Sequence, residues 1–452
     1  MSEGVEKIGK KDVAWSYMAT FFLIGSNIIL LPVILNKMPV ATVAVWSIFQ
    51  VISGLVHKLD FGFRPSFARN VSYIFSGVQK LQVEGVSAAE KSDNINYKLL
   101  KTSLHAMQNF YRWMAYTVLV LMLSFGSAYV YFVIFPKYEG SYLDLLFSWL
   151  ILIAVNSYNL YTLYYDALLL GKGYVKESQQ ITILGQVLYL FVSLVLILLG
   201  CGLTAIFSAQ FISVFIRRYF SYRVFFTKEL VTKLNLVHED DFKDVLHAIT
   251  PNAIKVGLTN LGGFLVNRSS VLLGSAFLSL EHIACFSITF QVVEVIAKCS
   301  TVYFQANTPR IAKFRASKNI GELKKLFNTS IISMLVVYIL FGSMFLLFGN
   351  YAMQLIKSET QFLPLALSST LILFSLLEHN HSISAGFIAA DNRIPFFIPS
   401  ILSGVLTVIL LWFFLSVCKL GLWGVLLAPG IAQLAYQNWK WPSVVIKELY
   451  SK

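Results

Sequence analysis

The stretch TSIISMLVVYILFGSMFLLF, residues 329–348, establishes the fold class of this chain. It carries no charged side chain, and a helix of about 20 apolar residues crosses the ~30 Å hydrocarbon core of a bilayer. Lys324 and Lys325 precede the stretch, and Lys357 follows it. The stretch is therefore predicted to be a transmembrane helix with a basic residue beyond each end.

The rest of the 452-residue chain repeats this pattern. Hydrophobic residues make up 57% of it and charged residues only 13%, which excludes a soluble globular protein. Two larger polar segments, 77–112 and 227–247, interrupt the apolar stretches, and the second joins the two halves. The sequence predicts an all-α polytopic membrane protein with twelve transmembrane helices: 13–35, 40–75, 113–135, 142–170, 181–200, 203–226, 249–278, 283–308, 329–348, 361–390, 395–417 and 422–441.

The basic residues are distributed unevenly between the loops on the two sides. Of the 36 Lys and Arg, 26 fall in segments on one side, whereas the other side carries only Lys37, Lys137, Lys357 and Lys419. Basic residues near helix ends stay in the cytoplasm. We therefore expect a protein of the cytoplasmic (bacterial inner) membrane with both termini cytoplasmic. This bias also explains the net charge of +13 without a nucleic-acid partner.

The two halves of the chain resemble one another. The sequence WSIFQV at 46–51 is echoed by FSITFQV at 286–292. We predict two six-helix bundles, residues 1–230 and 231–452, related by a pseudo-two-fold axis along the membrane normal. Such repeats suit alternating access by rocking. The four cysteines show no CxxC spacing, so neither a metal site, a disulfide framework nor another cofactor is expected.

Six cations fall inside the predicted spans, when the basic residues toward the cytoplasmic ends of the sixth and twelfth spans are counted as cytoplasmic. Charges within the bilayer are costly and usually functional. They favour a cavity for an anionic substrate: Lys58, Arg64, Arg69, Lys255, Arg268 and Lys298. In the second span Asp60 and Arg64 share a helical face and can pair. Pro65 is expected to kink the helix. Arg64 and Arg69 are predicted to bind an anionic head group, and the alternative is a cluster that reaches the interface.

The seventh, eighth and tenth spans carry the remaining candidate charges. Lys255 binds substrate or reaches the interface, and Arg268 binds substrate or forms a buried pair with a carboxylate. Glu294 precedes Lys298 by four residues and can pair with it. Glu378 and His381 lie one helical turn apart deep in the tenth span.

Glu378 and His381 are the main candidates for ion coupling. Imidazole changes charge near neutral pH, and a carboxyl group in an apolar environment tends to hold its proton. The coupling ion is a proton or sodium, with Asp60 and Glu294 as further candidates. The alternative is a hydrogen-bonded polar patch between helices. No third ligand lies close in sequence, which disfavours a metal site.

Tyrosines form a stripe in the fourth span. Tyr158, Tyr161 and Tyr165 recur at helical spacing. Aromatic faces can stack on sugars, so the three are candidate substrate-binding residues. An aromatic packing seam or interface belt is the alternative.

The sequence DFGFRPSFARNVSYIFSG, residues 60–77, resembles the end of the second span in bacterial O-antigen flippases. These belong to the multidrug/oligosaccharidyl-lipid/polysaccharide exporter superfamily. The resemblance implies two bundles around a central cavity. It implies a flippase that moves undecaprenyl-diphosphate-linked oligosaccharide to the outer leaflet for polysaccharide or lipopolysaccharide synthesis.

Three other functions remain open. A multidrug or organic-ion antiporter of the same superfamily is the nearest alternative, although cationic drugs favour acidic cavities. A membrane glycosyltransferase or polysaccharide polymerase needs a larger loop for its acid and base groups than the predicted outer turns provide. A channel is disfavoured by the repeat. We therefore expect a transporter rather than an enzyme.

Overall fold

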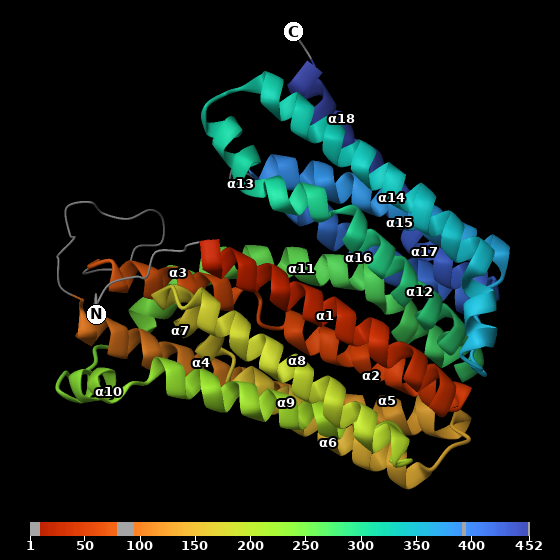
Figure 1. Ribbon diagram of the computed structural model, residues 1–452, viewed down its shortest axis with the longest axis horizontal. Helices are drawn as coiled ribbons and strands as arrows, with labels where there is room; N and C mark the ends of the chain where they lie inside the picture. The colour runs from red at the N-terminus through yellow and green to blue at the C-terminus, as the bar shows by residue number, and fades with distance from the viewer. Residues whose placement is uncertain (1–9, 79–94, 391–394, 451–452) are drawn as a thin grey trace. The chain divides into compact units, whose positions relative to one another are not determined.

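The computed structural model describes residues 10–78, 95–390 and 395–450 (Figure 1). Within these ranges the secondary structure is helical and contains no β-strand. Residues 1–9 and 451–452, whose cytoplasmic position the sequence predicts, lie outside the described residues. So does 79–94, part of the first polar segment, whereas a helix begins at Tyr97 in the remainder of that segment.

Packing groups the chain into two compact units, Met1–Met38 with Ile52–Gly257, and Pro39–Val51 with Leu258–Lys452. Two helices, α2 (Val40–Lys58) and α11 (Lys243–Phe277), therefore contribute to both units. The two units are defined by which residues pack together. The six-helix bundles at 1–230 and 231–452, which are predicted to rock against each other, therefore remain a prediction.

The first unit is built from helices of very different length. Short π-helical turns at Met122–Gly126 and Val130–Ile134 continue its third span. Its helices are α1 (Lys10–Lys37), α3 (Phe63–Phe75), α4 (Tyr97–Leu121), α5 (Ser127–Tyr129), α6 (Tyr142–Tyr161), α7 (Tyr164–Lys172), α8 (Val175–Leu198), α9 (Gly202–Phe225) and α10 (Lys228–Asn235).

The second unit contains the longest helix of the described chain, α14. A π-helical turn at Phe413–Val417 extends α16. Its helices are α12 (Leu280–Ser300), α13 (Val302–Ala316), α14 (Ile320–Leu355), α15 (Leu365–Ala389), α16 (Phe397–Trp412), α17 (Leu422–Leu434) and α18 (Gln437–Tyr450).

Each predicted span is occupied by a helix, and short turns at residues 38–39, 138–141, 199–201 and 278–279 lie where outer turns were predicted. The side of the membrane on which they lie stays a prediction. Among the described residues, eight segments are long and apolar enough to cross a membrane. The other four spans contain α9, α11, α15 and α17. Helix α17 has only 13 residues, and polar side chains interrupt the apolar stretches of α9, α11 and α15. Three of these four helices line the cavity described below.

The second span is broken in two. Between α2 and α3 the backbone of Phe61 has φ 47° and that of Gly62 has φ 73°, a left-handed conformation that suits glycine. A Cβ on Gly62 would lie 2.9 Å from Val256 Cγ1, so the close approach also requires glycine. The kink expected at Pro65 is wrong. Pro65 lies in the first turn of α3, where a backbone N–H has no intrahelical partner to lose.

The eighth span also changes helix, between Ser300 at the end of α12 and Val302 at the start of α13. The break is smaller than that in the second span, because only Thr301 separates the two helices and its φ of −93° and ψ of −1° lie in the right-handed helical region.

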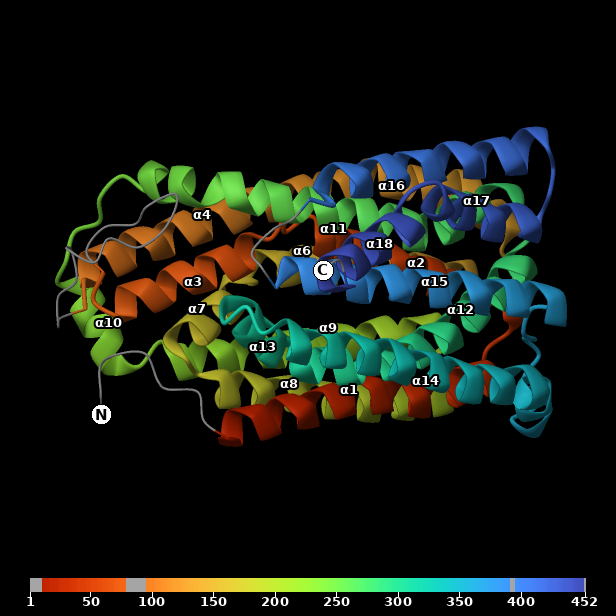
Figure 2. The ribbon, with the colours of Figure 1, turned by 90° about the horizontal axis from the view of Figure 1, so that it is seen from above.

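Close helix packing shapes the first unit. Helix α8 lies beside both α1 and α9 (Figure 2). Helix α3 packs on α7 at Gly171, where a Cβ would lie 2.5 Å from Val71 Cβ and 2.6 Å from the Ala68 carbonyl oxygen. Glycine at 171 therefore allows the backbones of these two helices to approach.

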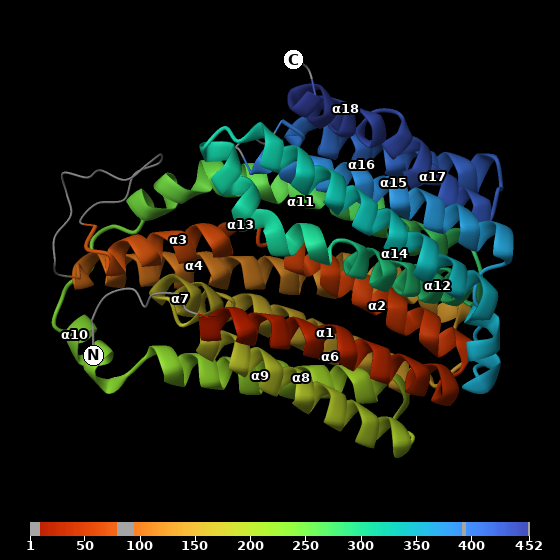
Figure 3. The same ribbon diagram turned by 45° about the horizontal axis from the view of Figure 1, so that its top comes forward.

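The second unit has an apolar core made by neighbouring helices. Figure 3 shows α12, α14 and α15 as neighbours, and α18 packs against α15. The buried side chains of this core include Phe327, Met334, Tyr338, Ile383, Phe387, Trp441, Val445 and Leu449.

Candidate functional site

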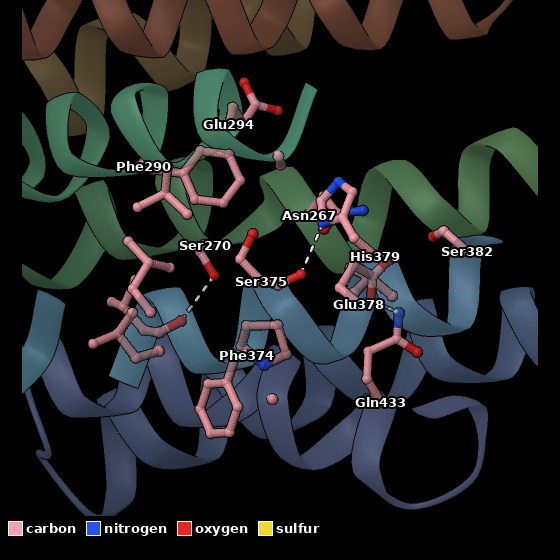
Figure 4. A pocket seen from close by; sticks show the side chains of 18 of the residues that line it. Asn267, Ser270, Phe290, Glu294, Phe374, Ser375, Glu378, His379, Ser382 and Gln433 are labelled. Carbon is pink, nitrogen blue, oxygen red and sulfur yellow. Dashed lines mark hydrogen bonds between the residues drawn. The ribbon is translucent and has the colours of Figure 1, made fainter. Parts of the chain in front are cut away.

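A cavity of about 240 Å³ lies inside the second unit (Figure 4). Helices α11, α12, α15 and α17 supply its walls, with one residue from α18. Its aromatic side chains are Phe286, Phe290 and Phe374, and its charged or strongly polar side chains are Asn267, Glu294, Lys298, Glu378, His379, Gln433 and Asn438. An apolar pocket with a few convergent polar groups is typical of a small-molecule site.

One face of α15 forms a wall of the cavity. Its lining residues recur at intervals of three and four, the spacing of neighbours on one helical face. They are Leu371, Phe374, Ser375, Glu378, His379 and Ser382. The helix is therefore apolar at its start and presents a carboxylate and an imidazole to the cavity farther along.

Glu378 has one close neutral donor. Gln433 Nε2 donates a hydrogen bond of 2.6 Å to its Oε2 (Figure 4). The Nδ1 atom of His381 lies 3.6 Å from the same oxygen, and both side chains are mostly buried. His381 Nδ1 lies closer, at 3.0 Å, to Oδ1 of Asn438 and donates to it. The structure thus brings Glu378 and His381 together in a polar group that also includes Gln433 and Asn438.

His379 is the histidine that lines the cavity, whereas His381 does not. Its Nδ1 donates a 2.8 Å hydrogen bond to the Ser375 carbonyl oxygen, which can only accept. The same atom lies 3.1 Å from Oη of Tyr338, whose hydroxyl contacts Ser375 Oγ at 2.8 Å. Nε2 of His379 therefore remains available to the cavity. His379 was not among the residues selected from the sequence, although its position beside Glu378 was a sufficient signal.

Arg268 forms an ion pair between α11 and α12. Its Nη2 lies 2.6 Å from each carboxylate oxygen of Glu294, and both side chains are 29% exposed. The guanidinium also lies 5.0 Å from the centre of the Phe290 ring. The structure therefore shows the carboxylate pair that the sequence gave as the alternative to substrate binding at Arg268.

Glu294 does not pair with Lys298, so the expected pair within one helix is wrong. Arg268 takes the carboxylate because its planar fork approaches from the neighbouring helix. Lys298 is exposed and lines the cavity, and no carboxylate lies within ion-pair distance of it among the described residues. The cavity is therefore lined by Lys298 and by two carboxylates. Glu294 is paired with Arg268, and Glu378 contacts Gln433 and His381.

In the first unit, Asp60 and Arg64 meet in a way that differs from the prediction. Asp60 is buried and accepts hydrogen bonds from the Tyr111 hydroxyl at 2.6 Å and from the Arg64 backbone N–H at 3.2 Å. The Arg64 guanidinium lies 3.8 Å from Asp166 instead. The expected side-chain pair is wrong because the chain between Lys58 and Phe63 is not helical.

A second ion pair in the first unit was not expected from the sequence. Arg218 of α9 is 2% exposed, and its guanidinium donates to Asp166 and to Asn159, both at 2.6 Å. The basic residues of α9 were counted as cytoplasmic. The available signal was the position of Arg218 about two turns inside the sixth span, on the same side of the membrane as Asp166, about one turn inside the fourth.

The tyrosine stripe packs mainly against aromatic neighbours in its own unit. Tyr158 stacks on Phe215 with ring centroids 6.0 Å apart, and Tyr165 contacts Tyr222 at the same separation. Tyr161 is 46% exposed. For Tyr158 and Tyr165 the geometry corresponds to the aromatic seam given as the alternative to sugar stacking.

The remaining candidate cations, Arg69 on α3 and Lys255 on α11, are exposed, as is the Arg64 side chain. Arg69 and Lys255 therefore remain accessible to solvent, head groups or substrate. Within the described residues, no three His, Cys, Asp or Glu side chains come together as a metal-binding group.

Comparison with known proteins finds similarity in three-dimensional structure but none in sequence. No protein-family model matches the chain, and no curated protein does. The fold is similar to an inward-facing multidrug resistance MATE family transporter of the MOP superfamily, with 15% identity, 96% of each chain covered and a TM-score of 0.68. It is also similar to the MATE multidrug transporter DinF-BH in complex with rhodamine 6G, with 12% identity, 99% of each chain covered and a TM-score of 0.64.

An outward-facing MATE family transporter is similar as well, with 16% identity, 98% of each chain covered and a TM-score of 0.56. At these identities the likeness establishes the fold. The chain is therefore a multi-pass, all-α membrane protein with the fold of the MATE transporters, in which twelve helices form two bundles.

Proposed function

We propose that this protein is a transporter of the MOP superfamily that moves an organic substrate by alternating access in exchange for protons. The observation that carries the proposal is the fold likeness over 96% of the chain to a MATE family transporter. The solved relatives include both inward-facing and outward-facing conformations, the two end states that alternating access requires. The repeat in the sequence supports the same mechanism.

The proposed coupling site is Glu378. Of the candidate carboxylates, Glu294 is neutralised by Arg268 and Asp60 is buried against Tyr111. Glu378 faces the cavity and is held by an amide and an imidazole, so it can gain or lose a proton without breaking a close ion pair. Opening the cavity to one side changes its hydration and hence its affinity for a proton. A proton gradient then favours one conformation by that difference in affinity.

The comparisons favour an organic cation or drug as the substrate. Two of the solved relatives are multidrug transporters, and one of these is in complex with rhodamine 6G. In this chain, three phenylalanines and the Glu378 carboxylate line one cavity. Aromatic faces and a carboxylate together attract a flat organic cation. A multidrug antiporter in the cytoplasmic membrane, with both termini cytoplasmic, is the resulting proposal.

A lipid-linked oligosaccharide flippase is the second candidate. Lys298 favours it, because an accessible ammonium in the cavity attracts a diphosphate and repels a cation. The stretch at 60–77 resembles O-antigen flippases, and its Arg64 and Arg69 are exposed. In this scheme Lys298 would bind undecaprenyl-diphosphate-linked oligosaccharide in the second unit, and Arg64 and Arg69 are separate candidates within the first unit.

Reconstituted vesicles distinguish the two candidates. Purified protein is placed in liposomes with an imposed pH gradient, and transport of rhodamine 6G is compared with flipping of a fluorescent undecaprenyl-diphosphate oligosaccharide. For an antiporter we expect dye transport driven by the gradient; Glu378→Gln should make the remaining transport independent of pH, and Lys298→Gln should preserve or increase transport. For a flippase, only the lipid-linked sugar moves, and Lys298→Gln slows it. Transport of neither compound by correctly folded protein would contradict both candidates.

A further inference from the structure

A second hollow lies on the surface of the second unit, between the first turns of α14 and the end of α18, and is separate from the cavity described above. It measures about 380 Å³ and is lined by Phe327, Asn328, Ile331, Ile332, Ile446 and Tyr450. Phe327 is buried at its base, whereas Ile332 is 60%, Ile446 49% and Tyr450 46% exposed at its sides. The feature is thus a shallow apolar groove that is open to its surroundings.

The groove lies where α14 passes from a polar to an apolar environment. The 36 residues of α14 extend about 54 Å at 1.5 Å per residue, well beyond the ~30 Å hydrocarbon core. The first turns of α14 carry Glu322, Lys324 and Lys325, and no charged residue follows until Lys357. Residues 327–332 are therefore expected at the boundary between lipid chains and head groups.

Two polar contacts lie at the end of the groove that is nearest the start of α14. The Tyr450 hydroxyl donates a 2.8 Å hydrogen bond to Asn328 Oδ1, which joins α18 to α14. Lys324 Nζ lies 4.7 Å from the centre of the Tyr450 ring. Lys325 follows on the adjacent face and is exposed, with no ion pair in the described parts of the chain. Lys324 therefore borders the apolar groove at its polar end, and Lys325 precedes the groove residues Asn328 and Ile332 by three and seven positions, on the same helical face.

Nearby carboxylates do not neutralise these lysines. Glu448 of α18 forms an ion pair with Arg315 of α13. Glu322 lies two residues before Lys324, on the opposite side of the helix, and three residues before Lys325, on the same side, and it forms no ion pair with either lysine within the described residues. The border of the groove is consequently positive, and the groove combines an apolar floor with a cationic edge.

We propose that this groove binds an anionic phospholipid of the bilayer. One acyl chain would lie along Phe327, Ile331 and Ile446, and the phosphate would lie between Lys324 and Lys325. The lysines attract a negative head group, and the groove lies where an amphiphile passes from head group to acyl chain. Both features favour an anionic lipid. The proposal does not depend on which substrate the protein transports.

Photo-crosslinking with lipid analogues tests the site. The full-length protein is reconstituted in liposomes containing trace photoactivatable phosphatidylglycerol or phosphatidylcholine, and labelled peptides are identified by mass spectrometry. We expect phosphatidylglycerol to label 324–332 and 446–450, with phosphatidylcholine labelling at least about five-fold weaker, since one lysine near the surface contributes roughly that factor.

Variants separate the head-group contact from the chain contact. Lys324→Gln with Lys325→Gln should remove the preference for the anionic lipid, whereas Lys324→Arg with Lys325→Arg should keep it. Ile332→Trp fills an exposed part of the groove and should lower labelling by both lipids. Lys419→Gln, at a predicted outer turn, is the matched control and should change nothing.

Equal labelling by the two lipids in the unaltered protein would overturn the proposal. So would a preference that persists in the Gln variant, or labelling that does not map to the groove. Absence of labelling by either lipid would likewise contradict it. Melting temperatures of all variants serve as the check on folding.

Discussion

The Arg268–Glu294 ion pair offers a direct test of how the second unit is held together. Arg268→Ala leaves the Glu294 carboxylate without its guanidinium partner inside a membrane span. Exposed pairs contribute about 0–1 kcal/mol, and loss of one partner of a fully buried pair costs about 3–5 kcal/mol. Both side chains here are 29% exposed. We therefore expect a loss of about 1–3 kcal/mol for the single variant.

A double-mutant cycle isolates the pair. Arg268→Ala, Glu294→Ala and the double variant are purified in detergent, and thermal unfolding is followed by circular dichroism. A unit of this size loses about 2–4 °C in melting temperature per kcal/mol. The double variant should lose about 1 kcal/mol less than the sum of the single variants, because it leaves no unpaired charge. Arg112→Ala is the control, since Arg112 is exposed and contacts the neutral Asn109.

Transport measured on the same variants shows whether Arg268 also contacts substrate. Arg268→Ala should impair transport more than Arg268→Lys, with normal membrane insertion, because lysine retains the charge opposite Glu294. Strictly additive losses of stability would refute the ion-pair argument. Recovery of stability without recovery of transport in the double variant would instead assign Arg268 a direct role in substrate binding.

Other parts of the molecule give three further predictions. Glu378→Gln should flatten the pH dependence of transport while substrate still binds, because the amide keeps the Gln433 contact but cannot exchange a proton; an unchanged pH profile in vesicles would place coupling elsewhere. Gly171→Ala should lower the melting temperature because its Cβ meets the α3 backbone, whereas Gly263→Ala, with nothing within 4 Å, should not; equal effects would contradict the packing argument. In a variant whose four native cysteines are changed to serine, a cysteine is placed at Lys37 or Lys357. It should react with an impermeant maleimide added to intact cells. Reaction only after the cells are permeabilised would reverse the predicted topology.

The order of amino acids was sufficient to predict the membrane architecture. Length and hydropathy of uninterrupted stretches such as 329–348 were enough, because the backbone in lipid must satisfy its own hydrogen bonds and forms helices. Helices occupy all twelve predicted spans, and short turns join them where outer turns were expected. The repeat at 46–51 and 286–292 lies in the second and eighth spans, but the structure alone shows that left-handed residues break the second span and a single turn residue divides the eighth. Substrate was not determined by the sequence, since the flippase resemblance and the fold comparison favour different cargoes.

The partners of the charged residues, by contrast, became visible only in three dimensions. Spacing along a helix proposed Asp60 with Arg64 and Glu294 with Lys298, yet Tyr111 binds the first carboxylate and Arg268 the second. Sequence spacing describes neighbours on one helix, whereas a guanidinium or a hydroxyl from an adjacent helix can approach a carboxylate with better geometry. Which side chain arrives from the adjacent helix depends on helix rotation and depth, and these are set by packing contacts across the whole bundle.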